Sequence, residues 1–121
     1  MNAFVIIQLH APGFHLWPSA PSETSFLRER HRHLFKFVVE FMVSSAKIGQ
    51  DDNRQIEFFE AQRMVSDALK ALWGRSPHEF GALSCERIAS DLHEQLRGIH
   101  AFLPCAIEVW EDGENGARLT W

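Results

Sequence analysis

Hydrophobic and polar residues alternate along the first part of the chain in a way that predicts two β-strands. Residues 3–9 (AFVIIQL) are mostly β-branched, aliphatic or aromatic, which is typical of a strand. From His31 to about Ile48, the odd positions beyond two histidines are apolar (Phe35, Phe37, Val39, Phe41 and Val43). This segment is predicted to be a long strand with one buried face. Residues 10–23, with three prolines and a glycine, are expected to be irregular.

Two amphipathic helices are predicted next, after a turn at residues 49–53. In residues 54–74 the apolar side chains fall on one helical stripe, and the terminal glycine is expected to end the helix. This stripe contains Ala61, Met64, Val65, Ala68, Leu69 and Leu72. After a loop at residues 75–83, residues 84–98 are predicted to form a second helix with Ser84 as its N-cap. Its stripe contains Ile88, Ala89, Leu92 and Leu96.

A hairpin is predicted at the end of the chain. Residues 105–111 and 117–121 alternate as strands around a DGENG turn. The resulting order, β-β-α-α-β-β, predicts an α+β domain in which two helices cover one face of a four-stranded antiparallel sheet. We expect residues 1–121 to form one such domain, with no internal repeat or linker.

Composition and charge narrow the class of protein. With 45% hydrophobic and 23% charged residues, the 121-residue chain has the balance of a globular domain. Its formal net charge of −4 argues against a nucleic-acid or membrane-surface binder, because such proteins are usually basic. No segment approaches the length of a membrane span, and the apolar start is too short for a signal peptide. Cys85 and Cys105 do not suggest a disulfide framework, so a cytoplasmic location is expected.

Two histidines separated by one residue raise the question of a metal site. On a strand, His31 and His33 point to the same face, with Cα atoms about 6.5 Å apart from two rises of roughly 3.3 Å. A catalytic zinc ion takes three protein ligands and leaves one position open. His15 is the candidate for the third ligand and His10 is its competitor. Ordinary strand and loop histidines would give the same pattern, because an HxH motif alone is weakly specific.

Several short motifs, taken in their order along the chain, favour the metal site over ordinary structural histidines. They are GFHLWP, RHRHLFKF, IEFFEAQ, SCERIASDL and IEVWED, and they extend from the first candidate histidine to Glu111. Together they resemble the 6-pyruvoyl-tetrahydropterin synthase family, which includes the queuosine-pathway 6-carboxytetrahydropterin synthases. The resemblance implies the tunnelling fold, or T-fold, which has the same β-β-α-α-β-β order.

The resemblance assigns roles to four residues. His15, His31 and His33 match the zinc-binding histidines of the family. Glu111 matches the glutamate that anchors the amino-pyrimidine edge of the pterin, which suits a carboxylate because it accepts two hydrogen bonds from adjacent N–H groups. Without the resemblance, an acid beside a hairpin turn is more often a surface residue. Arg32 replaces the glycine that the family has between the paired histidines.

The pocket and the catalytic machinery are matched less completely. Cys85 and Glu86 match the segment at the start of the second helix that lines the pterin pocket. The proton-abstracting cysteine of the family is replaced by Leu27. A variant group has a glutamate where this chain has Arg28, and Glu29 lies one place later, on the opposite face of a strand. Because a thiol near a helix N-terminus tends to have a lowered pKa, Cys85 is a candidate nucleophile, although most such cysteines are inert.

The second catalytic element of the family, an Asp-His pair, has no counterpart, since SPHEFG offers only His78 and Glu79. Three functions remain open. One is a zinc-dependent lyase-type enzyme acting on a dihydroneopterin triphosphate-like or related purine-derived substrate. The alternative is a catalytically silent T-fold protein that binds metal and a pterin, purine or nucleotide. The third is a structural T-fold oligomer without metal. The resemblance also implies a homo-oligomer, a trimer or hexamer.

Overall fold

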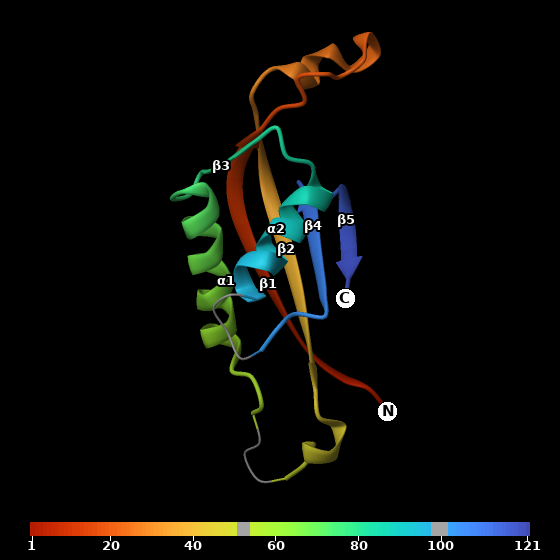
Figure 1. The fold of residues 1–121 in the computed structure, drawn as a ribbon, viewed down its shortest axis with the longest axis vertical. Coiled ribbons are helices and arrows are strands. Elements are labelled where there is room, and N and C mark those ends of the chain that lie inside the picture. The colour runs from red at the N-terminus through yellow and green to blue at the C-terminus, as the bar shows by residue number, and fades with distance from the viewer. Residues whose placement is uncertain (51–53, 98–101) are drawn as a thin grey trace.

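The computed structural model describes residues 1–50, 54–97 and 102–121 as a mixed sheet with two long helices on one face (Figure 1). The strands are β1 (Ala3–His15), β2 (His31–Val43), β3 (His78–Gly81), β4 (Ala106–Glu111) and β5 (Asn115–Thr120). Their order in the sheet is β3-β1-β2-β4-β5. The helices are α1 (Phe58–Trp73) and α2 (Cys85–Arg97), with short 3-10 helices η1 (Ser22–Arg28) and η2 (Ser45–Lys47).

The sheet has a fifth strand, so the expectation of a four-stranded antiparallel sheet is wrong in this detail. β3 lies in the segment predicted to be a loop, and it pairs in parallel with the end of β1. Within it, buried His78 and Phe80 alternate with exposed Glu79 and Gly81. A strand of four residues is too short for this alternation to stand out in the sequence. It forms because β1 offers it an edge.

β1 is longer than predicted, because it continues from residue 9 through Pro12 and Gly13 to His15. β3 pairs with β1 only from Gly13 onward, so Pro12 lies where that side of β1 has no partner among the described residues. A residue without an N–H group is tolerated at such an edge. Gly13 is required by packing, because a Cβ atom there would overlap the ring of Phe80.

The remaining boundaries differ by a few residues from the predicted ones. β2 ends at Val43, and η2 follows where the strand was expected to continue. α1 begins four residues later than predicted, after Glu57, whose carboxylate accepts the N–H groups of Phe59 at 3.0 Å and Glu60 at 2.7 Å. Gly74 ends α1 at a φ of +74°, as expected. Part of the predicted 49–53 turn and the last residue of the predicted 84–98 helix lie outside the described residues.

The core lies between the sheet and the helices, and it uses the predicted positions. The odd-numbered residues Phe35, Phe37, Val39 and Phe41 of β2 are buried in the core with residues of α1 and α2. All four residues of the predicted α2 stripe are buried, and Ser84 accepts the Arg87 N–H at 3.2 Å as the expected N-cap. Burying such faces is the main favourable contribution to folding. In the described part of the chain, no helix is long and apolar enough to cross a membrane.

The opposite face of the sheet carries even-numbered residues and is not covered by either helix (Figure 1). Four large apolar side chains are exposed on it: Phe4, Ile6, Leu34 and Met42. The candidate site lies at the end of the sheet where β1 and β4 end, β2 begins and α2 starts, so the fold brings chain segments of distant sequence position together there.

Candidate metal centre

The pairing of β1 with β2 brings the three candidate histidines together. In this antiparallel register His15 faces His31, and Gly13 faces His33, so all three imidazoles lie on the core face at the end of the sheet. The ring centroid of His15 lies 4.5 Å from that of His31 and 5.0 Å from that of His33, and the latter two are 4.9 Å apart. One potential ligand atom of each residue lies within 4.8 Å of the others.

Hydrogen bonds orient the three histidine rings so that the same nitrogen, Nδ1, faces an oxygen acceptor in each. The Nδ1 atom of each has an acceptor: Leu83 O for His15 at 3.3 Å, Glu29 O for His31 at 2.8 Å, and Asp112 Oδ2 for His33 at 2.6 Å. Because carbonyl and carboxylate oxygens only accept, each Nδ1 is inferred to carry the proton. Each Nε2 atom then presents a lone pair, which is the form that binds a metal.

The Nε2 atoms converge on a position that suits a cation. Those of His31 and His33 are buried and have no hydrogen-bond partner. The Glu111 carboxylate lies beside them, with Oε1 3.3 Å from His15 Nε2 and Oε2 3.5 Å from His33 Nε2. Burial lowers the pKa of His15, although Glu111 acts against this, so His15 is held neutral. Lone pairs and a carboxylate facing one another are stabilised by a shared positive charge, so the residues present fit a divalent metal ion such as zinc.

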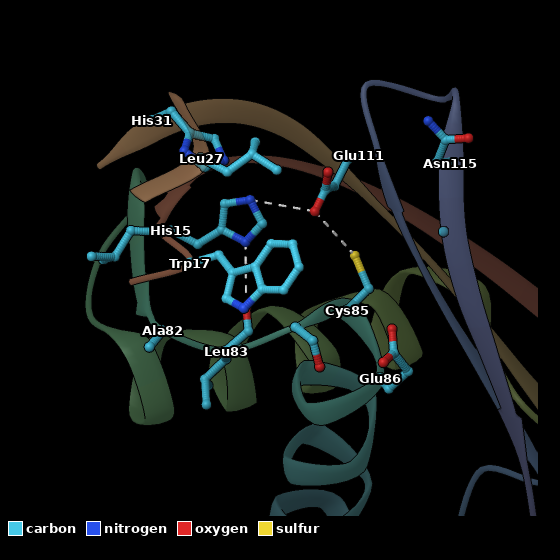
Figure 2. A pocket seen from close by; sticks show the side chains of 13 residues that line it. His15, Trp17, Leu27, His31, Ala82, Leu83, Cys85, Glu86, Glu111 and Asn115 are labelled. Atoms are coloured by element: carbon cyan, nitrogen blue, oxygen red, sulfur yellow. Dashed lines mark hydrogen bonds and ion pairs between the residues drawn. The ribbon is translucent and has the colours of Figure 1, made fainter. Parts of the chain in front are cut away.

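A cavity of about 390 Å³ opens next to the histidines (Figure 2). Its walls come from β1 and the segment after it, η1, the start of β2, the start of α2 and the residues before it, the end of β4 and the start of β5. The lining residues are His15, Leu16, Trp17, Leu27, His31, Ala82, Leu83, Ser84, Cys85, Glu86, Glu111, Asn115 and Gly116. The cavity therefore combines apolar and aromatic walls with two carboxylates, and none of these lining residues is a lysine or arginine.

Cys85, Glu86 and Glu111, which the resemblance assigns to a pterin pocket, all line this cavity (Figure 2). The electrostatics of Cys85 differ from the expectation, however. Its thiol donates a hydrogen bond to Glu111 Oε1 at 3.5 Å. Burial, followed by the negative charge of Glu111, raises the pKa of the Cys85 thiol to about 12. The expected lowering of this pKa by the helix N-terminus is wrong, since desolvation and a neighbouring carboxylate outweigh it.

Other residues considered from the sequence lie away from the cavity. His10 is exposed on the uncovered face of the sheet, opposite Lys36. His78 is buried in β3 and pairs through Nδ1 with the Gly74 carbonyl at 2.7 Å. Glu79 forms an exposed ion pair with Arg30. Leu27, which the resemblance aligns with a cysteine, does line the cavity, and its side chain cannot transfer a proton.

Two residues at the candidate site, Asp112 and Trp17, were not expected from the sequence. Asp112 contacts His33, but in the sequence it reads as the first residue of an Asp-Gly hairpin turn. Its position directly after Glu111 was the available signal. Trp17 forms an aromatic wall of the cavity and is 48% exposed, although it lies in a proline-containing segment expected to be irregular (Figure 2). An aromatic residue two places after a candidate ligand was the signal there.

Comparisons with solved structures identify the fold. The structure of 6-pyruvoyl tetrahydropterin synthase from Caenorhabditis elegans matches with a TM-score of 0.74 and 10% sequence identity, over 100% of this chain and 96% of that one. An uncharacterized protein from Wolinella succinogenes matches with a TM-score of 0.64 and 14% identity, over 99% and 98% of the two chains. No protein-family model and no curated protein matches the sequence. The chain has the fold of 6-pyruvoyl tetrahydropterin synthase.

Proposed function

We propose that this chain is a zinc-dependent lyase-type enzyme, similar to the 6-pyruvoyl- and 6-carboxytetrahydropterin synthases, that acts on a pterin or related purine-derived substrate. One observation carries the proposal. His15, His31 and His33 each place a potential ligand atom within 4.8 Å of the others, beside the Glu111 carboxylate and next to a cavity that His15, His31 and Glu111 line. A cavity of this size lies within the range of small-molecule sites, which typically combine apolar walls with a few polar groups.

The chain's own residues provide the groups that would bind a heterocycle. Glu111 presents two acceptor oxygens, one of which already accepts from the Cys85 thiol. A carboxylate of this kind suits the adjacent N–H and NH₂ groups of an amino-pyrimidine edge. Trp17 offers an aromatic wall against which a planar ring can stack. These residues support the binding of a flat, nitrogen-rich ring next to the metal centre.

The three histidines would hold the zinc ion through Nε2. When bound there, zinc supplies Lewis-acid polarisation of oxygens on the substrate's side chain. Proton transfer falls to the chain itself, and here the site differs from the family pattern. Leu27 has no titratable group, and the Cys85 thiol is held protonated by burial and by Glu111. Neither of these two lining side chains can therefore accept the proton, and Glu111 is already assigned to the ring.

The same observations favour a second function, that of a silent binder. A site with intact metal ligands and ring-binding groups, but with leucine in place of the proton-abstracting cysteine, supports binding of metal and heterocycle without turnover.

The charge of the cavity also indicates which charge its ligand carries. Glu86 and Glu111 line it and no lysine or arginine does, which favours an unphosphorylated heterocycle over a triphosphate.

The proposal is tested by measuring metal content and ligand turnover on untagged protein, beside a His31→Ala/His33→Ala variant. We expect about one zinc ion per chain in the wild-type protein and none in the variant. The loaded protein is then incubated with pterin and deazapurine precursors, and products are identified by mass spectrometry. Product formation that is lost in the variant supports the enzyme. Zinc and ligand binding without product supports the silent binder, and absence of stoichiometric zinc from both proteins overturns both functions.

We further propose that the chain forms a homo-oligomer, a trimer or hexamer. The uncovered face of the sheet supports this, because it exposes Phe4, Ile6, Leu34 and Met42. Phe4, Ile6 and Met42 lie close together in the register of β1 and β2, and exposed apolar side chains grouped on one face often mark a contact with another protein. Light scattering coupled to size-exclusion chromatography tests the proposal. A monomer at micromolar concentration would contradict it, and Ile6→Lys is expected to shift an oligomer toward smaller species.

A further inference from the structure

We infer that Asp112 is a positioning residue for the metal centre: its carboxylate fixes the ring orientation and tautomer of His33, so that Nε2 of His33 is available to a metal ion. The metal-binding part of this inference rests on the proposed function. Asp112 does not line the cavity, and it lies one residue beyond Glu111, at the start of the hairpin between β4 and β5. It would therefore act through His33 and not on a ligand.

The geometry of Asp112 is determined by β2. Its backbone N–H donates to the Leu34 carbonyl at 2.8 Å, and its Oδ1 accepts the Leu34 N–H at 2.8 Å. Its Oδ2 lies 2.6 Å from His33 Nδ1. Both carboxylate oxygens are thus engaged with consecutive residues of one strand. Such a carboxylate has little freedom to turn, and it holds the His33 ring in one orientation.

The backbone of Asp112 is unusual in a way that supports a specific role. Its φ is +55°, a left-handed conformation that asparagine, aspartate and glycine adopt more readily than other residues. The next residue, Gly113, also has a positive φ, of +70°. Glycine would satisfy the turn at Asp112 at least as well, so turn geometry does not by itself explain the carboxylate.

Asp112 also differs from the groups that orient the other two histidines. Nδ1 of His15 and Nδ1 of His31 face neutral backbone carbonyls, whereas Nδ1 of His33 faces a charged carboxylate. Carboxylates that accept from a metal-binding histidine fix its tautomer and increase the basicity of the ligating nitrogen. Together with Glu111, Asp112 also places two carboxylates beside the three imidazoles, an arrangement that suits a divalent cation.

Replacement by asparagine separates positioning from packing, because the two side chains have the same shape. If the amide oxygen of Asp112→Asn accepts the Leu34 N–H, the amide NH₂ group faces His33 Nδ1. His33 Nδ1 then has to accept, and the proton moves to Nε2, where it blocks metal binding. The flipped amide would keep the His33 tautomer but would set its NH₂ group against the Leu34 N–H, donor against donor, so the first orientation is favoured. Asp112→Gly removes the carboxylate but keeps a residue suited to the positive φ.

The experiment measures zinc affinity and the His33 tautomer on the full-length chain. Zinc dissociation constants are obtained by competition with a chromophoric chelator for the wild type, Asp112→Asn and Asp112→Gly. Glu114→Gln is the matched control, since it removes an exposed charge from the same hairpin. We expect 10- to 100-fold weaker zinc binding in both Asp112 variants and a change below about threefold in the control. Long-range ¹H–¹⁵N NMR of the metal-free proteins is expected to show Nδ1–H in the wild type and Nε2–H in Asp112→Asn.

Three results would overturn the inference: wild-type zinc affinity in both Asp112 variants, an unchanged His33 tautomer in Asp112→Asn, or weakening of equal size in Glu114→Gln. A merely structural role of Asp112 would lower the melting temperature of the metal-free protein without moving the tautomer. Failure of the proposed function is distinguishable, because it appears as a wild-type protein that binds no zinc. The tautomer comparison is made on metal-free protein and decides the role of Asp112 in either case.

Discussion

Glu111 Oε1 lies 3.3 Å from Nε2 of His15, so a carboxylate from the end of β4 touches the imidazole at the end of β1. This contact joins the metal centre to the cavity, because Glu111 lines the cavity and also accepts from the Cys85 thiol. Binding of a ring at Glu111 would therefore place it directly beside the histidines. The first prediction follows from this dual position.

Glu111→Gln is expected to separate ring binding from metal binding. The amide keeps one acceptor but turns an NH₂ group toward one N–H of the heterocycle, so we expect at least tenfold weaker binding of a pterin, which corresponds to about 1.4 kcal/mol. The three histidines remain, and zinc stoichiometry should stay near one per chain. Calorimetric titration and elemental analysis measure the two quantities. Unchanged pterin affinity would contradict the assignment of Glu111 as the ring anchor.

Cys85 is expected to be unreactive toward alkylation at pH 8. Its pKa of about 12 means that the thiolate is a minor species, roughly a thousandfold rarer than for a thiol with a pKa near 9. Iodoacetamide modification is followed by mass spectrometry in the variants Cys105→Ser and Cys85→Ser, each of which retains one thiol. We expect Cys85 to react at least 100-fold more slowly than free cysteine. Rapid modification of Cys105→Ser, which retains Cys85, would contradict this expectation and support Cys85 as a nucleophile.

The cavity is expected to discriminate against phosphate. Glu86 and Glu111 are both among its lining residues, and a like-charge contact costs on the order of 1 kcal/mol or more at close range. Metal-free protein should bind dihydroneopterin at least several-fold more tightly than its triphosphate. The Glu86→Gln variant serves as the comparison, because it should narrow this difference by improving triphosphate binding alone. Tighter binding of the triphosphate to the wild type would show that cations from outside the described cavity take part.

His93 is expected to make the protein less stable in mild acid. Burial lowers the pKa of His93, and a backbone hydrogen bond to Pro104 and the charge of Glu94 oppose this. The ring stacks on Trp121, with centroids 3.6 Å apart. Since the unfolded chain then binds more protons, the contribution of neutral His93 is present above pH 6.5 and is lost as the pH falls below it.

The measurement compares melting temperatures at pH 7.5 and pH 5.5 for metal-free wild-type protein and His93→Phe. Phenylalanine keeps an aromatic ring against Trp121 but does not titrate. We expect a smaller fall in the melting temperature of the variant, and the comparison cancels the contribution of His15, which both proteins share. Equal falls in the two proteins would remove His93 as a source of acid sensitivity.

Gly13→Ala is expected to destabilise the domain by about 1–3 kcal/mol, the usual cost of overpacking a filled core. The added Cβ would overlap the Phe80 ring and lie 3.1 Å from Cδ2 of Phe35, both of which are buried. Chemical denaturation measures the free energy of unfolding. Gln8→Ala, at an exposed position of the same strand, is the control and should change it by less than about 0.5 kcal/mol.

Much of the fold could be predicted from the sequence because its signals are local and repeated. The apolar odd positions of β2 identify a strand with one buried face, and Ser84 with the stripe after it identifies α2. β3 could not be found in this way. Its four residues become a strand only through pairing with β1, and that pairing depends on how α1 returns the chain to the sheet.

For the candidate site, the sequence by itself determined which residue types are available and that His31 and His33 share a face, because alternation along a strand is a local property. The tertiary structure decided which histidine joins them. His15 lies on the core face opposite His31, whereas His10 lies on the uncovered face. It also decided the electrostatics of Cys85: burial, followed by contact with Glu111, which is 26 residues away in sequence, raises the pKa of the thiol. Distances between groups far apart in the chain set burial and charge interactions, and only folding sets those distances.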